Sequence, residues 1–455
     1  MLLGKRFESF VEKSPVSVMM RGIVERIFHP DRLEQIFEEY AVKQYTHLLP
    51  FHSVAEVLSE VVFNITPSVG AGLQAREGTM PVSRRSFYNK LNNVEPCVGA
   101  ALVADSAKQV ELVIEELQVR RTPLLKGFHT RVLDGNHFAA TEHRLEVLRH
   151  DTAAPLPGQA LVVLDGDLRL VRNVFPCEDA HAQERSLLHL VLPTMRYNDV
   201  WIADRNFCTL MFLISVARRM VKFAIRHHAN MPYTLIGKQK VCGRTETGQV
   251  FEQAAHIFDP VTGEKFRIRV ITILLDNPTR DKDRELRVLT NLSVNQATGI
   301  QVAELYRKRW TIESMFQELT EHLTCEIRTL AYPKAALFAF CLALVAWNGV
   351  SLLLAALAAV HGEEHVDQNV SGFYIALEIS LVTNGMMIAI PEKYWSPFRD
   401  LNPAQLAQTL KDLAKNVNLA KYKSHPRGPK GPKTKRKYSG NGQHVATARL
   451  ICRSK

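Results

Sequence analysis

The clearest pattern of apolar and polar positions along the chain lies in residues 304–320, where it repeats at helical spacing. One face is apolar and would hold a helix against a core; its residues are Leu305, Ile312, Phe316, Leu319 and, just beyond the segment, Leu323. On the adjacent face Tyr306, Arg309 and Glu313 follow one another at intervals of three and four residues. This face is either an amphipathic surface with an Arg–Glu pair or an arrangement that holds a metal ion beside a phosphodiester.

Two upstream apolar runs each lead to an aspartate. Residues 131–138 form a short β-type run with Asp134 at its polar end, and residues 200–207 form an apolar strand that carries Asp204 at its tip. Carboxylates at strand ends of an α/β sheet lie where ligands usually bind. Together with Glu313 they would hold two divalent cations about 3.5–4 Å apart, the geometry for in-line attack at phosphorus. Hard oxygen ligands favour Mg²⁺ or Mn²⁺ over zinc.

The remaining pattern predicts helices first and strands afterwards. Residues 1–125 are typical of helices, and the stretch 161–174 contains two β runs around Asp165-Gly166, which indicates a hairpin turn. Asp165 and Asp167 are therefore turn residues, and Asp134 is the better candidate ligand. Further expected elements are a helix over 180–192, a helix over 208–220, a strand over 223–226 and a β-rich stretch over 234–289.

Residues 335–360 are almost all apolar and long enough to cross a bilayer. Asn348 and Trp347 lie at the centre of this stretch, and polar residues 361–364 follow it directly. A tryptophan in a membrane helix is expected near the interface, so the pattern favours a helix buried inside the protein. A membrane span stays as the alternative.

Composition and charge indicate a polyanionic partner. The 455 residues are enough for two or three structural units, and 57 Lys and Arg against 46 Asp and Glu give a formal net charge of +11. The seven cysteines are scattered without a C-x-x-C pair, which is typical of reduced thiols in a cytoplasm. The first residues contain no apolar core of signal-peptide length.

Two basic segments are candidate DNA contacts. Ser83 is a suitable helix cap for the run that follows it, in which Arg84, Arg85 and Lys90 are basic. This run is either the second helix of a helix-turn-helix in a DNA groove or an exposed basic helix. Residues 422–437 are dense in Pro, Gly, Lys and Arg, so they would add salt-dependent affinity for phosphates or simply keep the protein soluble.

These motifs together resemble the DDE transposases of bacterial insertion sequences, in the insertion-sequence-four family marked by a Tyr-x2-Arg-x3-Glu-x6-Lys signature. Tyr306, Arg309 and Glu313 match the signature, and Asp134 in D-G-N and Asp204 in A-D-R-N-F match the two aspartate motifs. The signature lysine falls at Thr320, so one contact to the DNA backbone would pass to Lys308 or His322. The resemblance runs from about residue 40 to about residue 420.

The resemblance implies an α/β fold: a ribonuclease-H-like catalytic core with a β-rich insertion before the glutamate helix, flanked by helical N-terminal and C-terminal regions. The expected division of the chain follows the order of the elements. It comprises a helical DNA-binding region (1–125), the catalytic core (126–330) with its insertion at about 230–290, a helical region with dimer contacts (331–421) and a basic disordered tail (422–455).

The function implied is cut-and-paste transposition, by metal-dependent strand cleavage and strand transfer at terminal inverted repeats. Asp134, Asp204 and Glu313 would bind two Mg²⁺ ions, for which Mn²⁺ substitutes, while Tyr306, Lys308 and Arg309 would contact DNA. The expected partner is double-stranded DNA, bound by a homodimer in the cytoplasm, at the nucleoid and away from membranes. The alternatives are a domesticated or inactive DNA-binding remnant of a transposase and a non-transposing metal-dependent nuclease.

Overall fold

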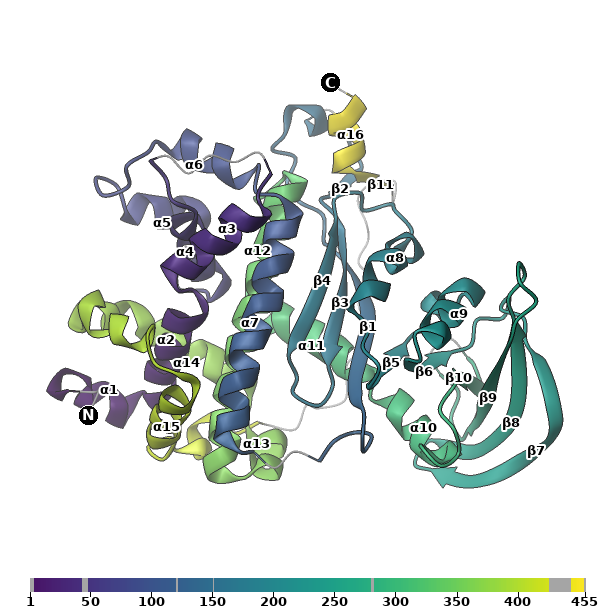
Figure 1. The fold of residues 1–455 in the computed structure, drawn as a ribbon. Helices are drawn as coiled ribbons and strands as arrows, with labels where there is room; N and C mark the ends of the chain where they lie inside the picture. The colour runs from purple at the N-terminus through teal and green to yellow at the C-terminus, as the bar shows by residue number, and fades with distance from the viewer. Residues whose placement is uncertain are drawn as a thin grey trace.

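The computed structural model describes residues 4–42, 48–119, 122–149, 151–279, 282–424 and 443–453. Within these ranges a nine-stranded sheet runs through the protein, in the order β4-β3-β1-β5-β6-β10-β9-β8-β7 (Figure 1). Its strands are β1 (His129–His137), β3 (Gln159–Asp165), β4 (Val171–Cys177), β5 (Asp199–Ala203), β6 (Lys222–Arg226), β7 (Thr234–Thr245), β8 (Gly248–Phe258), β9 (Lys265–Leu275) and β10 (Glu285–Thr290).

The first half of the sheet combines a hairpin with parallel strands. β3 pairs antiparallel with both β1 and β4, whereas β5 pairs parallel with both β1 and β6. β3 is buried along its whole length, which explains its almost unbroken apolar sequence. In the β1–β5 register Leu133 lies opposite Ala203. Asp134 and Asp204 follow these two residues, so the sheet brings them to the same edge.

The β-rich stretch predicted over residues 234–289 is present and extends the central sheet. β10 pairs antiparallel with β6, and β9, β8 and β7 continue outward from it. In Figure 1 these strands curve away on the right, with β7 as the outer edge. The β-rich stretch is thereby joined to β6 and, through it, to β5 and β1 by continuous backbone hydrogen bonds.

A layer of helices covers the sheet on the side of β4, at the left of Figure 1. α12 packs against α7, α2, α4 and α15, so the N-terminal and C-terminal helical regions that the sequence separates share one core. The helices of the chain are α1 (Glu8–Lys13), α2 (Pro15–Ile27), α3 (Pro30–Tyr40), α4 (Phe51–Val62), α5 (Val69–Ala75), α6 (Arg84–Leu91), α7 (Pro96–Leu117), α8 (Leu188–Val191), α9 (Leu210–Arg218), α10 (Gly299–Arg307), α11 (Trp310–His322), α12 (Pro333–His361), α13 (Glu363–Asn369), α14 (Gly372–Ala389), α15 (Pro403–Ala414) and α16 (Thr447–Arg453).

The long apolar helix α12 is a core helix, as the sequence favours. Its most apolar window is 89% buried inside the protein. Asn348 at its centre accepts a hydrogen bond from the Val171 backbone N–H at 2.8 Å and donates to the Val171 carbonyl at 3.1 Å. A buried amide satisfied in this way ties α12 to the edge strand β4. α14 is also long and apolar enough to cross a membrane, but only 22% of its most apolar segment is buried.

Two predicted elements differ in the structure. The helix expected over 180–192 is a series of short helical turns, Glu184–Leu187, Leu188–Val191 and Leu192–Thr194, and Pro193 removes a backbone N–H that a longer helix would need. The prediction of a basic disordered tail over 422–455 is wrong for residues 444–453. There β11 (His444–Ala446) pairs parallel with β2 (Ala154–Leu156) and leads into α16.

The ordered C-terminal end is held by an ion pair as well as by the strand. Arg449 of α16 donates from Nε and Nη2 to the Asp179 carboxylate, at 2.8–3.0 Å. Such bidentate pairs fix orientation as well as charge. Residues 425–442, which contain most of the predicted basic tail, lie outside the described residues.

Candidate active site

The two aspartates predicted as ligands lie side by side where the parallel ladder between β1 and β5 ends. Asp204 directly follows β5, whereas Asp134 lies inside β1, which continues to His137 in its pairing with β3. Asp134 has a side chain that is only 19% exposed, and its Oδ1 accepts a hydrogen bond from the Gly135 N–H at 2.9 Å. Asp204 directly precedes the short 3-10 turn Arg205–Phe207. The edge of a sheet beyond parallel strand ends is where α/β proteins usually bind ligands.

The third acid comes from a helix that is interrupted. The single helix expected over 304–320 is instead α10 and α11, joined by a turn at Lys308 and Arg309. The Arg309 N–H donates to the Tyr306 carbonyl at 3.0 Å and the Ile312 N–H donates to the Arg309 carbonyl at 3.2 Å. These bonds span three residues, so the turn is tighter than an α-helix. Tyr306 and Glu313 therefore lie on consecutive helices rather than on one helix face.

The start of α10 is set by its own sequence. The Thr298 side chain accepts a hydrogen bond from the Gln301 N–H at 3.2 Å, and the Gln301 side chain accepts one from the Thr298 N–H at 2.9 Å. This capping box satisfies two backbone donors that the helix leaves open. The predicted apolar stripe then holds both helices, because Leu305, Ile312 and Leu319 are buried.

Arg309 joins the strand-borne and helix-borne acids. Its Nη1 lies 3.2 Å from Asp134 Oδ2 and 2.6 Å from Glu313 Oε1, so one guanidinium bridges carboxylates that are far apart in sequence. The Arg309 side chain is 10% exposed, and its Nε is buried without a hydrogen-bond partner in the described part of the chain. The break in the helix falls where this side chain reaches Asp134, a tertiary contact that helical periodicity does not encode.

The electrostatics show that negative charge is concentrated here. Burial raises the pKa of Asp134 to about 6, Arg309 opposes this rise, and the neighbouring Glu313 and Asp204 add to it. Burial also raises the pKa of Tyr306 to about 12 and Asp204 contributes in the same direction, so this phenol stays protonated at neutral pH. Acids with pKa values shifted by burial and by like charges are typical of functional sites.

The donor set suits a hard divalent cation. Across the described ranges no group of three or more His, Cys, Asp or Glu side chains is arranged to hold a metal ion as it stands. The positive charge between Asp134 and Glu313 is supplied by Arg309. Three carboxylates nonetheless match the ligand preference of Mg²⁺, and a cation would offset the burial of the Asp134 charge. The residue types therefore suit such an ion, while in this structure Arg309 lies between Asp134 and Glu313.

The basic residues predicted to contact DNA differ in their surroundings. Arg84 and Arg85 are exposed on α6, which begins as expected with Ser83 accepting a hydrogen bond from the Ser86 N–H. Lys90 is turned inward: its Nζ donates to the Leu49 carbonyl at 2.6 Å and lies 4.9 Å from the centre of the Phe37 ring. Lys308 is exposed in the turn beside Arg309.

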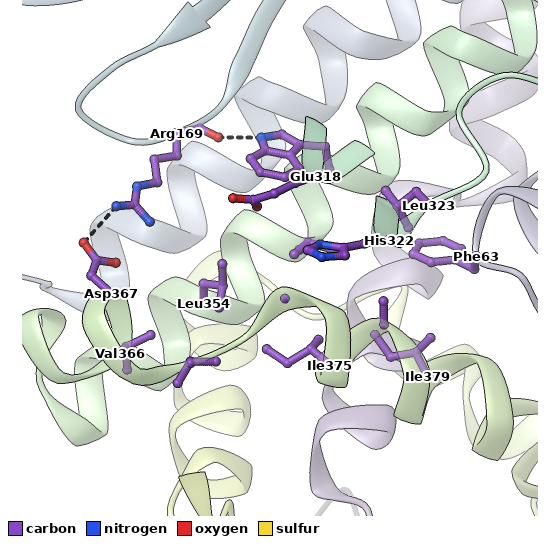
Figure 2. Close-up of a pocket in the computed structure, with 15 residues that line it drawn as sticks. Phe63, Arg169, Glu318, His322, Leu323, Leu354, Val366, Asp367, Ile375 and Ile379 are labelled. Carbon is purple, nitrogen blue, oxygen red and sulfur yellow. Dashed lines mark hydrogen bonds and ion pairs between the residues drawn. The ribbon is translucent and has the colours of Figure 1, made fainter. Parts of the chain in front are cut away.

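The two residues considered as substitutes for the signature lysine point to different surroundings. His322 and Glu318 of α11 line a cavity of about 120 Å³ that is also lined by residues of α12, α13 and α14 (Figure 2). His322 is partly buried there, beside Leu323 and Phe63. Thr320 is exposed, and its hydroxyl donates to the Phe316 carbonyl at 2.9 Å. Of the two substitutes, Lys308 is the exposed one.

Three further residues at the site were not singled out by sequence reasoning. Arg226 is the last residue of β6, which lies next to β5, and its Nη2 lies 2.6 Å from Asp283 Oδ2. Its positive charge acts to lower the pKa of the Tyr306 phenol, against the larger effect of burial. Trp310 is 62% exposed, with its ring centre 5.9 Å from the Arg309 guanidinium carbon. Glu184 lies against Gly135 and Asn206, between the two aspartate motifs. Of these three residues, Arg226 carried a signal in the sequence, because it comes directly after apolar strand residues, as Asp134 and Asp204 do.

Residues 133–348 match the family model described as the transposase DDE domain. The chain contains a DDE transposase domain. The matched span begins within β1, one residue before Asp134, and ends inside α12, so it includes Asp204, the β-rich insertion and Glu313.

Comparisons with individual proteins add less. A comparison with curated proteins finds no match. Among solved structures, the chain is similar to the one described as the cryo-EM structure of the piggyBac transposase synaptic complex with hairpin DNA. The two chains are 13% identical with a TM-score of 0.36, over 93% of this chain and 89% of the other. Membership of the insertion-sequence-four family stays a prediction from the motifs.

Proposed function

We propose that this protein is a DNA transposase that moves an insertion sequence by cut-and-paste, cleaving DNA at terminal inverted repeats and joining the ends to a target. One observation carries the proposal: within the DDE transposase domain, Asp134 on β1 and Glu313 on α11 share the Arg309 guanidinium, with Asp204 at the adjacent strand end. The first five strands, in the order β4-β3-β1-β5-β6, support a ribonuclease-H-like core.

In this proposal Asp134, Asp204 and Glu313 hold two Mg²⁺ ions, with Mn²⁺ as a substitute. Bound there, the ions would activate the attacking oxygen and stabilise the leaving oxygen of the phosphodiester. The chain's own groups position the DNA. Arg309 is a permanently charged donor for a phosphate, and Tyr306, whose pKa is raised to about 12, donates a hydrogen bond as a neutral phenol.

The partner is double-stranded DNA, which agrees with the net charge of +11. Lys308 beside the site and Arg84 and Arg85 on α6 are exposed cations that suit phosphate contacts. Two element ends must be held together for transposition, so we expect a homodimer on DNA, acting in the cytoplasm at the nucleoid. Strand transfer through a hairpin intermediate at the element end belongs to the same proposal.

The experiment that tests the proposal is the substitution Glu313→Gln in the full chain. It keeps the size of the side chain but removes a charged oxygen ligand, so Mg²⁺-dependent nicking of end-containing DNA should be abolished while binding of the ends persists. Glu304→Gln is the matched control, since Glu304 lies on α10 and pairs with Arg307; this variant should cleave as the wild type does. Metal-dependent nicking by the Glu313→Gln protein would overturn the proposal.

The same assay separates the rival functions. An inactive DNA-binding remnant, for which Thr320 in place of the signature lysine is the supporting observation, would bind ends without nicking them in Mg²⁺. A non-transposing nuclease would cut, but a 3′-hydroxyl end supplied with target DNA would not replace water as the nucleophile. Joined products between element ends and target DNA would distinguish the transposase from both.

A further inference from the structure

A fourth acid, Glu184, lies between the two aspartate motifs. It begins the 3-10 turn Glu184–Leu187, and its side chain is only 15% exposed. Its Oε2 accepts a hydrogen bond from the Nδ2 of Asn206, which is two residues after Asp204. Its other oxygen, Oε1, faces Gly135, which directly follows Asp134, and lies 3.6 Å from His137 Nδ1. One carboxylate therefore contacts the segments that follow both candidate ligands.

Gly135 is what lets this carboxylate come so close to β1. A β-carbon added at Gly135 would lie 2.6 Å from Glu184 Cδ and would overlap Oε1. Gly135 is not among the residues with positive φ, so its backbone conformation is open to other residues. The glycine is needed for close approach, one of the recognised reasons for a glycine inside a strand. A larger residue would push the Glu184 side chain away from the strand.

A second contact fixes the same turn. Arg185, the neighbour of Glu184, donates from Nε to the Asn206 carbonyl at 2.8 Å. Residues 184 and 185 thus hold Asn206 by its side chain and by its backbone, and Asn206 lies within the 3-10 turn that begins directly after Asp204. Gly135 and Asn206 both lie beyond the last pair of the β1–β5 ladder, so the contacts of residues 184 and 185 link the two segments where that ladder no longer does.

We propose that Glu184 is a positioning residue that fixes Asp134 and Asp204 relative to each other by bridging Gly135 and Asn206. The inference rests on the proposed function, because it concerns the spacing of the ligands for the divalent ions. Groups that orient metal-ligating carboxylates usually change metal affinity by about 10–100-fold when they are removed. Glu184 does not contact DNA or the ions in this proposal; it acts through Gly135 and Asn206.

The first test uses Glu184→Ala in the full chain. The Mg²⁺ concentration for half-maximal end cleavage should rise about tenfold, while end binding without metal and the thermal midpoint stay as in the wild type. Mn²⁺ binding, followed by electron paramagnetic resonance without DNA, should weaken by a similar factor. Glu184→Gln should restore both values to within about threefold, because its amide oxygen still accepts from Asn206. Glu115→Ala, an exposed position on α7, is the matched control.

The second test approaches the contact from its other side. Gly135→Ala displaces the Glu184 carboxylate, so it should raise the Mg²⁺ requirement as Glu184→Ala does. The double variant should be no worse than Glu184→Ala alone, since the shorter alanine side chain at position 184 leaves room for the new β-carbon; residues that act through one contact are non-additive in this way. Additive effects of the two substitutions would show that they act separately and would overturn the proposal.

The outcomes separate this inference from the function on which it rests. Wild-type protein that neither cleaves ends with Mg²⁺ nor binds Mn²⁺ would remove the proposed function. Normal wild-type cleavage with an unchanged Mg²⁺ requirement in Glu184→Ala would leave the function and overturn the role of Glu184. If Glu184→Ala does not fold, Glu184→Gln and Gly135→Ala decide: an unchanged Mg²⁺ requirement in Gly135→Ala overturns the role, and a raised requirement supports it.

Discussion

The two ends of β5 carry acid–arginine clusters of similar composition but opposite character. At its start Asp199 meets Arg131, which also pairs with Asp165 on β3. Beyond its end Asp204 lies near Asp134, which pairs with Arg309. The first cluster is buried, with Asp165 and Asp199 each 2% exposed, whereas in the second Asp134 is 19% exposed and Glu313, on α11, is 45% exposed. The difference between them distinguishes a cluster whose charges stabilise the folded protein from one whose charges destabilise it.

The cluster at the start of β5 has two arginines, Arg131 and Arg172, for its three acids, and both arginines pair with Asp165. Asp165 Oδ2 lies 2.5 Å from Arg131 Nη1 and 2.9 Å from Arg172 Nη2, and Arg172 also pairs with Glu111 on α7. Asp165 Oδ1 accepts two further hydrogen bonds from backbone N–H groups. Burial raises the pKa of Asp165, but Arg131 and Arg172 outweigh it, so that pKa is lowered. The charged form of this acid is the stable one.

The cluster beyond the end of β5 is short of positive charge. Asp134 and Glu313 share one arginine, with Asp204 as a third acid nearby. The pKa of Asp134 accordingly moves in the opposite direction from that of Asp165, to about 6. A buried acid whose charge is incompletely balanced costs stability, and proteins keep such groups where function needs them. The two ends carry the same number of acids, so the number of arginines that pair with them distinguishes the buried end from the more exposed one.

The largest effect on stability is expected at the balanced cluster. Asp165→Asn removes the charge that Arg131 and Arg172 share, and deleting one partner of a buried ion pair costs about 3–5 kcal/mol. Urea unfolding of the variant and of the wild type at pH 7.5 measures this loss in the free energy of unfolding. A loss below about 1 kcal/mol would mean that the cluster is not a structural brace.

The matched substitution at the other end should have the opposite sign. Asp134→Asn removes a buried negative charge that is poorly balanced, so without divalent ions at pH 7.5 we expect the variant to be about 1–2 kcal/mol more stable than the wild type. Cleavage should be lost at the same time. Destabilisation comparable to that of Asp165→Asn would show that the Asp134–Arg309 pair is structural, and the contrast between the two ends would fail.

The pH dependence checks the sign of this difference. Because the pKa of Asp134 is about 6 in the folded protein and near its ordinary value of 3.8 when unfolded, its favourable contribution is fully present below about pH 4. That contribution is lost as the pH rises through 6. The stability advantage of Asp134→Asn should therefore grow between pH 4 and 6 and level off above about pH 7. A gap between variant and wild type that shrinks over this range would contradict the shift.

The same contrast explains what the sequence could predict. Strands with unbroken or alternating apolar patterns were predictable. The proximity of Asp134 and Asp204 was also predictable, because each comes directly after apolar strand residues. The hairpin at Asp165 was also predictable, since Asp-Gly is a turn signal. The ion network around Asp165 was not, because it joins Glu111, Arg131 and Arg172 through tertiary contacts.

The misses share this cause. The break between α10 and α11 arises where Arg309 reaches across to β1, and Glu184 comes to the site through a glycine and an asparagine rather than through a motif of its own. The strand at residues 444–446 depends on pairing with β2, some 290 residues earlier (444 − 154 = 290). Local periodicity contains no information about partners this remote, whereas it describes well the elements that bury their own apolar face.

The smallest expected effect tests whether the end with too little positive charge accepts more of it. Thr320 lies on α11 seven residues after Glu313, so the two side chains are on nearly the same helix face, and Thr320 is exposed. Thr320→Lys adds a cation there without disturbing a core, so stability should change by less than about 0.5 kcal/mol. If the residue faces the DNA backbone, the slope of the logarithm of end affinity against the logarithm of salt concentration should steepen by about 1.

The control places the same charge elsewhere. Gln408→Lys adds a lysine at an exposed position of α15, so it changes the net charge of the protein equally. A steeper salt dependence in Thr320→Lys alone would place a phosphate beside α11 and show that Thr320 occupies a contact position without making the contact. Equal slopes in the two variants would mean that α11 provides Glu313 but does not contact the DNA backbone at position 320. Lys308 would then be the cation that contacts the backbone in place of the signature lysine.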